Sequence, residues 1–238
     1  MKIASAKWKA ALSPRTVKME SVSNSKQMKS LNYSLGTLVT AALLITGCAT
    51  ENYKNSASTA AALNRSSEMI TTGNLLIDQS LANLNDLVSH PGTDLRQQFQ
   101  VFSASLDDLG STAKDTADKA VEMKARGAAY FARWDEESAK MRNEDIRTRS
   151  EERRNEVALR FDRISRQYDA TKTSFEPFLS DLRDVQRFLA TDLTAGGLSA
   201  IKDVSVKANR DAVPLKASMA KLSVEFQGLG VAMSPTTK

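Results

Sequence analysis

Residues 99–134, FQVFSASLDDLGSTAKDTADKAVEMKARGAAYFARW, contain apolar and small residues that recur in alternating steps of four and three. The full series is Leu95, Phe99, Phe102, Leu106, Leu109, Ala113, Thr116, Ala120, Met123, Gly127, Tyr130, Trp134 and, after one polar position, Met141. This spacing places every member on one stripe of an α-helix, whereas the faces of a strand alternate with a period of two. The stretch therefore predicts a long helix with a heptad seam.

Three further segments follow the same spacing. Their seam residues are Leu63, Ile70, Ile77, Leu81, Leu84 and Val88 in the first segment; Val157, Phe161, Ile164, Tyr168, Thr171, Phe175, Phe178, Leu182, Val185 and Leu189 in the third; and Leu198, Ile201, Ala208, Leu215, Met219, Leu222, Phe226 and Leu229 in the fourth. The composition is rich in Ala, Leu, Glu, Lys and Arg, which are strong helix formers. We expect an all-α fold, either an antiparallel hairpin of long helices or a four-helix bundle.

Turn signals mark the expected helix boundaries. The sequence HPGT at residues 90–93 should end the first helix, residues 142–146 (RNEDI) should hold the central turn, and residues 195–197 (AGG) should separate the third helix from the fourth. Pro177 and Pro214 fall inside helical patterns, so we expect kinks or short breaks there.

The expected helix lengths predict a projection. The two middle helices exceed the outer two by about 15 residues, or roughly 22 Å at 1.5 Å per residue. Short connections favour an up-down-up-down arrangement. Residues from about 128 to 160 should therefore project as a two-helix coiled coil from a bundle formed by residues 56–230, at the end where the first helix begins.

A second stretch, LGTLVTAALLITGCAT at residues 35–50, ends its apolar run at Cys48, the single cysteine. The run is too short to span a bilayer and has the length of the apolar region of a secretory signal. Ile45, Thr46, Gly47 and Cys48 resemble a bacterial lipobox, and this resemblance implies cleavage before Cys48 and a diacylglyceryl group on its sulfur. The alternative is a buried helix with an inert Cys48.

These features divide the chain. We expect residues 1–47 to be a leader with the signal peptide, Met28 to be the true start, residues 48–55 to be a polar tether and residues 231–238 to be a disordered tail. Ala49 is not the aspartate that retains many lipoproteins in the inner membrane. The resemblance therefore implies a place on the periplasmic leaflet of the outer membrane.

Removal of the leader also changes the charge. The whole chain has 33 basic and 28 acidic residues, of which residues 1–47 hold seven basic and one acidic. The remainder, with 26 basic and 27 acidic residues, is nearly neutral. The mature protein thus lacks the strongly basic balance of a nucleic-acid-binding protein, and we expect no nucleic-acid partner.

The sequence contains no recognisable catalytic constellation. His90 is the only histidine, and its place before Pro91 is more typical of a helix end than of a general base. There is no HExxH motif, no paired Cys/His ligand spacing and no phosphate loop. We therefore expect no enzyme, no metal and no cofactor. Periodic carboxylates on long helices are usually solvated, but an unrecognised carboxylate-based enzyme stays an alternative.

The expected end of the hairpin is rich in arginine. Residues 140–166 carry nine basic and six acidic side chains, whereas residues 78–118 carry two basic and seven acidic ones. The candidate interaction residues are Trp134, Arg142, Arg147, Arg149, Arg153 and Arg154. One interpretation is a solvated coiled coil that is stiffened by Glu–Arg pairs at helical spacing. The other is contact with phosphate head groups or with an acidic patch on a partner.

The same region carries a resemblance to a family. The pattern YFxxWDxE at residues 130–137, followed by SExRR at residues 150–154, resembles the central signature of a bacterial family of helical envelope lipoproteins known only as a domain of unknown function. The resemblance implies an all-helical, coiled-coil-like lipoprotein. It brings no activity, so no catalytic residue is carried over.

Together these features predict a lipid-anchored, periplasm-facing helical lipoprotein that acts as a non-enzymatic structural or protein-interaction module of the envelope. The first alternative is a binder of anionic lipid through the arginine-rich end of the hairpin. The expected contacts of the protein are the membrane, through lipidated Cys48, and a protein or anionic lipid at the hairpin. Small seam residues such as Ala113, Ala120 and Gly127 also permit self-association.

Overall fold

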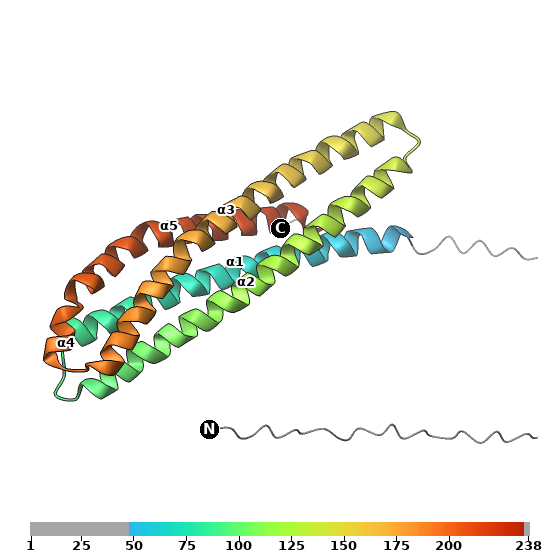
Figure 1. Ribbon diagram of the computed structural model, residues 1–238. Coiled ribbons are helices and arrows are strands. Elements are labelled where there is room, and N and C mark those ends of the chain that lie inside the picture. Colours follow the sequence, from blue (N-terminus) through green and yellow to red (C-terminus); the bar gives the residue numbers. More distant parts are fainter. Residues whose placement is uncertain (1–47, 236–238) are drawn as a thin grey trace, which may run out of the picture. The chain divides into compact units, whose positions relative to one another are not determined.

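The computed structural model describes residues 48–235, with side chains from residue 54 onward. Its elements are α1 (Cys48–Ser89), α2 (Leu95–Ala139), α3 (Glu144–Thr191), α4 (Ala195–Ala200) and α5 (Lys202–Met233). No strand occurs in this part of the chain (Figure 1). The predicted all-α fold is confirmed.

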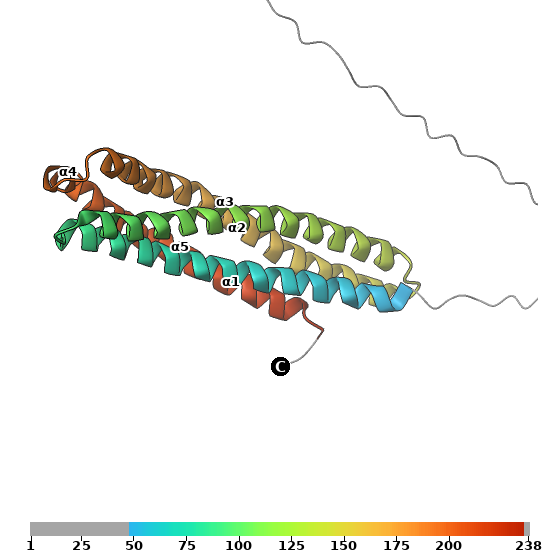
Figure 2. The same ribbon diagram turned by 90° about the horizontal axis from the view of Figure 1, so that it is seen from below.

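The four long helices are arranged as a ring. α1 packs against α2 and α5, and α3 packs against the same two helices. Within residues 48–235, the diagonal pairs α1–α3 and α2–α5 do not come into close contact. Successive long helices run in opposite directions, and the short helix α4 lies in the turn between α3 and α5 (Figure 1 and Figure 2). This is the up-down-up-down order that short connections favour.

The core of the bundle follows the heptad seam. Leu106 and Met123 on α2, and Leu182 and Leu189 on α3, are at most 1% exposed. All seam residues of the third segment except Phe175 are buried, as are all those of the fourth segment. Burial of a Leu or Phe side chain stabilises a fold by about 1.5–3 kcal/mol. The repeated apolar spacing is therefore the main source of stability in this fold.

Polar pairs also cross the interface between α1 and α5. The hydroxyl of Ser67 donates to the carbonyl oxygen of Ser223 at 2.9 Å, and the hydroxyl of Ser223 donates back to the carbonyl oxygen of Ser67 at 3.1 Å. Further along, the side-chain amides of Asn85 and Asn209 donate to each other's oxygens at 2.9 and 2.8 Å. Because buried polar groups must keep their partners, these reciprocal bonds fix the register of the two helices.

Side-chain caps begin three of the helices. Asp94, Asn143 and Thr194 hold the N-cap positions of α2, α3 and α4. Each side-chain oxygen accepts a backbone N–H two or three residues further on, at distances of 3.0 to 3.2 Å. These bonds satisfy amide groups that have no partner inside the helix.

Two predicted boundaries are wrong by a few residues. The central turn occupies residues 140–143 instead of 142–146, because Asn143 caps the helix that follows. Residues 195–197 begin α4 instead of separating two helices, because Thr194 caps them. The interruption of the fourth segment falls at Ile201, between α4 and α5.

The prolines inside the helical patterns do not break them. Pro177 lies within the continuous helix α3, and Pro214 lies within α5. Each proline removes one backbone donor, yet helical geometry is kept on both sides. α5 follows a gently bowed course in Figure 1. Of the two alternatives expected at these positions, a kink or a short break, the break does not occur.

The helical body also extends beyond its expected limits. α1 begins at Cys48, so residues 48–55, which we expected to be a tether, are helical. α5 runs to Met233, which shortens the expected tail of residues 231–238. The hydroxyl of Ser56 donates to the carbonyl oxygen of Met233 and so joins the start of α1 to the end of α5. The predicted leader, the start at Met28 and the Ile45–Gly47 motif lie outside the described residues.

Beyond the end of α5, α2 and α3 continue as a hairpin (Figure 1). Its base is marked by Arg126, which donates to Ser58 of α1 at 3.0 Å, and by Arg153, which donates to the carbonyl oxygen of Ala232 of α5 at 3.3 Å. The hairpin and the start of α1 therefore lie at the same end of the bundle.

Candidate functional site

We define the hairpin tip as residues 140–150, which comprise the turn after α2 and the first two turns of α3. Trp134, predicted as an interaction residue, lies just before it and is half-buried. Its indole N–H donates to the hydroxyl of Ser150 at 2.8 Å, and Ser150 also shares a hydrogen bond with Ser138 at 2.8 Å. The Tyr130 ring meets the Trp134 ring edge to face, with centroids 5.5 Å apart. Trp134 therefore holds α2 to α3.

Arg153 and Arg154 also make contacts within the molecule. Arg153 pairs with Glu156 at 2.6 Å, in addition to its bond to α5. Arg154 pairs with Asp135 at 2.8 Å, and its guanidinium lies 5.3 Å from the centre of the Phe131 ring. A guanidinium over an aromatic face is a favourable arrangement. These two arginines thus brace the base of the hairpin.

The remaining candidates lie at the hairpin tip. Arg147 pairs with Glu144 at 2.5 Å and approaches Glu151 at 3.8 Å. Arg142 and Arg149 are exposed, and within residues 48–235 neither forms an ion pair or a side-chain hydrogen bond. The six predicted residues therefore separate into four with internal partners and two whose charges are available.

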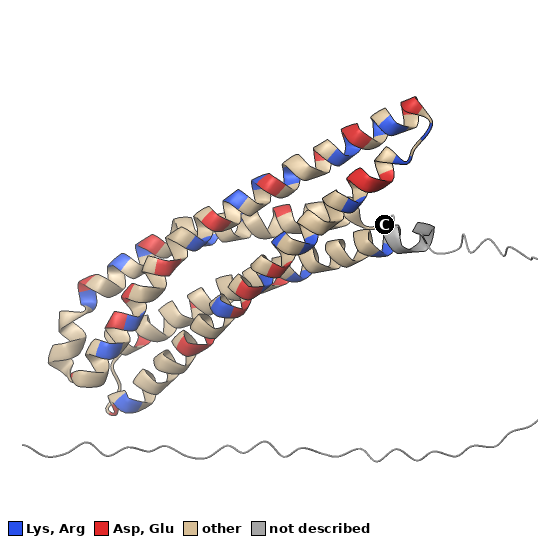
Figure 3. Cartoon of the chain, turned by 45° about the vertical axis from the view of Figure 1, so that its right-hand side comes forward, with Lys and Arg blue, Asp and Glu red and all other residues tan. Residues whose placement is uncertain are grey.

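An apolar side chain accompanies the two available arginines. Ile146 lies between Arg142 and Arg149 in the sequence and is 53% exposed. Figure 3 shows basic and acidic residues alternating along both arms of the hairpin. Most charges there neutralise one another at short range. Among the described residues, the tip exposes Arg142, Arg149 and Asp145 without an ion-pair partner, together with Ile146.

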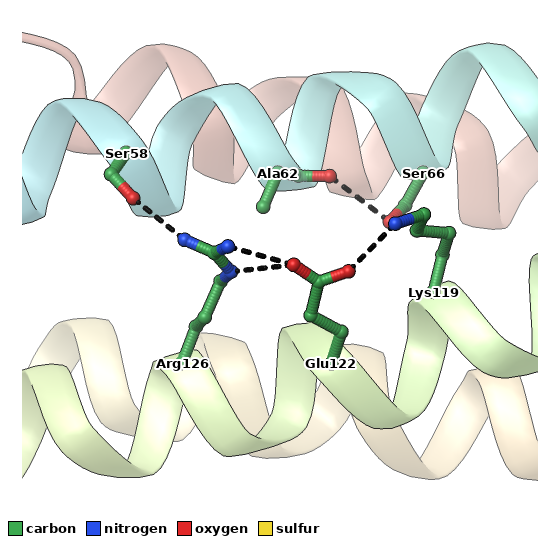
Figure 4. A network of polar contacts seen from close by, with 6 residues as sticks. All are labelled: Ser58, Ala62, Ser66, Lys119, Glu122 and Arg126. Atoms are coloured by element: carbon green, nitrogen blue, oxygen red, sulfur yellow. Dashed lines mark hydrogen bonds and ion pairs between the residues drawn. The ribbon is translucent and has the colours of Figure 1, made fainter. Parts of the chain in front are cut away.

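The carboxyl groups whose pKa is lowered are held in ion pairs and are not set up for acid catalysis. Lys119 and Arg126 lower the pKa of Glu122 to about 2, first through hydrogen bonds at 2.8 and 2.7 Å and then through their charges. Figure 4 shows this cluster between α1 and α2, with Arg126 also reaching Ser58. Arg153 lowers the pKa of Glu156 in the same way. A general acid at neutral pH needs the opposite shift.

Among the described residues, no group of three or more His, Cys, Asp or Glu side chains has the geometry to hold a metal ion. His90 is exposed at the end of α1, and its backbone N–H donates to the carbonyl oxygen of Asp86 at 2.9 Å. It therefore occupies the helix-end position that its sequence context indicated.

One feature was not anticipated from the sequence. A cavity of about 630 Å³ lies between the middle parts of α2 and α3 and reaches residues of α1 and α5. It occurs where the seam of α2 carries the small residues Ala113 and Thr116, next to Gly110 and opposite Phe175 of α3. Small seam residues usually indicate close packing of two helices. The sequence alone therefore did not predict that a cavity remains between α2 and α3 here.

These features define the class of protein as an all-helical antiparallel bundle with a projecting two-helix hairpin. A family model described as "Protein of unknown function (DUF2959)" matches residues 59–226, and the chain belongs to this family. The matched range spans the body of all four long helices, the hairpin and the cavity. The predicted membership of a family with a domain of unknown function is confirmed.

No curated protein and no solved structure matches the chain. In the described part of the chain, none of the helices combines the length and apolar character that crossing a membrane requires.

Proposed function

We propose that the protein is a lipid-anchored lipoprotein of the bacterial envelope, attached through Cys48, and that it acts as a non-enzymatic structural or interaction module on the periplasmic leaflet of the outer membrane. The lipobox-like sequence before Cys48 supports the anchor. The proposed role rests on one observation: the start of α1 and the hairpin lie at the same end of the bundle. An anchor at Cys48 would bring the hairpin close to the membrane and to proteins on it.

The helical start of α1 gives this proposal a mechanical consequence. Because α1 begins at Cys48, an acyl group there would be attached to the first residue of a continuous helix. The orientation of the bundle would then be restrained by the helix, whereas a flexible tether would leave it free. The hairpin tip, with Arg142, Ile146 and Arg149 exposed, is the proposed contact surface.

The anchor is tested by metabolic labelling. Cells that express the protein are fed an alkyne analogue of palmitate, and the purified chain is examined for the label. We expect incorporation in the wild-type chain and none in Cys48→Ser. Label that persists in Cys48→Ser, or its absence from both chains, would contradict the proposed attachment.

The contact surface is tested by crosslinking in intact cells. A photoreactive residue is placed at Arg142 or Arg149, and a control is placed at Val206 or Val213, which are exposed on α5. We expect a discrete crosslinked species from the tip positions and none from the control positions. Equal crosslinking from both sets would indicate nonspecific contact and would contradict an interaction tip.

A second candidate function is favoured by the two unpaired arginines. A basic residue near an anionic membrane surface contributes about 1 kcal/mol to binding, and Ile146 adds an exposed apolar side chain between them. Residues 48–238 with Cys48→Ser, without the basic leader, should therefore bind vesicles that contain phosphatidylglycerol, and salt should weaken the binding. If the protein did not bind these vesicles at low salt, this function would be excluded.

The two pairs of arginines provide a matched comparison. Arg142→Glu with Arg149→Glu should weaken vesicle binding about tenfold or more, because neither arginine has an ion-pair partner among residues 48–235. Arg153→Glu with Arg154→Glu should mainly loosen the base of the hairpin, since both residues have internal partners. An unchanged affinity in the first pair would assign the binding to another surface.

A further inference from the structure

The cavity between α2 and α3 has the dimensions of a ligand site. Its volume of about 630 Å³ lies within the range of roughly 300–1,000 Å³ that is usual for small-molecule sites. Its inner wall reaches the centre of the bundle, where Ile70, Met219 and Leu222 are buried. Met219 is unbranched and flexible, so this wall can adapt to the shape of an apolar guest.

The mouth of the cavity is basic, and most of its charges are paired. Lys172 approaches Glu176 at 3.6 Å, and Arg187 pairs with Asp184 at 2.8 Å. Lys114, also at the mouth, approaches Asp118 at 4.0 Å. These contacts leave Arg183 as the one lining cation that has no carboxylate within 4.0 Å among residues 48–235.

Arg183 reaches across the gap between the two helices. A Cβ atom added at Gly110 of α2 would lie only 2.5 Å from Nη2 of Arg183, which belongs to α3. The guanidinium therefore occupies the space that the missing side chain of Gly110 leaves open. It presents an unpaired, planar positive charge at the edge of an apolar cavity.

We propose that this cavity binds a single long-chain fatty acid, with its carboxylate on Arg183 and its hydrocarbon chain between α2 and α3. A guanidinium matches a carboxylate in geometry and forms two parallel hydrogen bonds with it. One unpaired cation corresponds to the single charge of a carboxylate, whereas a phosphate monoester carries a charge of about −1.5 to −2 near pH 7. The site does not depend on acylation of Cys48.

The test uses the full chain with Cys48→Ser, so that no attached acyl group competes. Binding is measured with undecanoate that carries a terminal dansyl group, whose fluorescence rises in an apolar site, and palmitate is the competitor. We expect palmitate to displace the probe and cetyl alcohol, which lacks the charge, to do so at least about tenfold more weakly. Failure of palmitate to displace the probe, equal potency of cetyl alcohol, or displacement by dodecyl phosphate alone would overturn the proposal.

Two matched pairs of variants locate the site. Arg183→Gln should weaken palmitate binding about tenfold, whereas Arg187→Gln, at the same mouth but already paired, should change it by less than about twofold. Ala117→Trp should fill the cavity and abolish binding, whereas Ala104→Trp, exposed on the same helix, should not. Circular dichroism confirms that each variant is folded. Equal effects within either pair would overturn the proposal.

Discussion

The ring of Phe161 on α3 lies directly against the backbone of Gly127 on α2. A Cβ atom at residue 127 would come within 2.7 Å of both Cε1 and Cε2 of this ring. Phe161 also meets Phe131 edge to face, with ring centroids 5.7 Å apart. Glycine at this seam position therefore allows α2 and α3 to approach each other at the base of the hairpin.

Gly127→Ala should consequently destabilise the protein. Overpacking of a filled core costs about 1–3 kcal/mol, which exceeds the gain of up to about 1 kcal/mol from replacing glycine in a helix. We expect a net loss of up to about 2 kcal/mol in the free energy of unfolding, measured by urea denaturation. The loss should shrink when Phe161→Leu is also present, because the clashing ring is then absent.

Gly228→Ala is the matched control for this substitution. Gly228 lies inside α5, and no atom of the described residues lies within 4 Å of a Cβ atom built on it. The same chemical change should therefore stabilise the protein, by about 0.5–1 kcal/mol. A similar effect of both substitutions would show that helix propensity, and not contact with Phe161, governs residue 127.

Leu106→Asp and Leu182→Asp should each unfold the bundle. Both leucines are at most 1% exposed, and an unpaired carboxylate in that environment costs several kcal/mol, a large share of the stability of a typical domain. Circular dichroism should show loss of helicity or of cooperative melting. Leu159→Asp serves as the control, because Leu159 is 68% exposed. Cooperative melting of either core variant at the wild-type temperature would contradict the seam assignment.

Trp134→Phe should loosen the hairpin and leave the rest of the bundle intact. The substitution removes the indole N–H that donates to Ser150, and such a bond is worth about 0.5–1.5 kcal/mol. Amide hydrogen exchange should become faster between Trp134 and Ser150, with little change in α1 or α5. Ser150→Ala completes a double-mutant cycle, and full additivity of the two substitutions would contradict the coupling.

The ion pairs of Glu122 should make stability depend on pH. Hydrogen bonds from Lys119 and Arg126 lower the pKa of Glu122 to about 2 in the folded protein, from an ordinary value of 4.5. A lowered carboxyl pKa contributes stability above the unfolded value, and this contribution is lost as pH falls toward the folded value. The size of the effect is limited because the group is exposed to solvent.

The measurement compares thermal midpoints of the wild-type chain and Glu122→Gln. At about pH 6 the wild type should melt at the higher temperature, and the difference should shrink through pH 4 and vanish near pH 2. Added salt should reduce the difference at pH 6, because exposed charges are screened. A difference that stays constant down to pH 2 would show that Glu122 acts through packing instead.

The core could be predicted from the sequence because its signal is local. Leu182 and Phe226 are buried for the same reason that they recur at steps of three and four: an amphipathic helix must cover its apolar stripe. The boundaries were less accurate because caps such as Asn143 depend on the exact geometry of a turn. Pro177 stayed within a helix because packing on both sides outweighs one lost hydrogen bond.

The candidate sites were only partly visible in the sequence. Six residues near the hairpin looked equivalent as interaction candidates. Arg154 finds Asp135 across the hairpin, whereas Arg142 and Arg149 find no ion-pair partner in the described part of the chain. Such pairings join different helices, and helical periodicity specifies which face a charge lies on but not which neighbour it meets.

The sequence by itself determined the helical class, most of the residues that form the core and the presence of a projecting hairpin, because side-chain periodicity and helix length are properties of each segment alone. It missed the fully buried Leu87, while the predicted seam residues Val88 and Phe99 are only half-buried. The tertiary structure decided the contact of Phe161 with Gly127, the internal pairing of the arginines and the cavity beside Arg183. These depend on the distance between helices, which is set by how whole rows of side chains pack against each other.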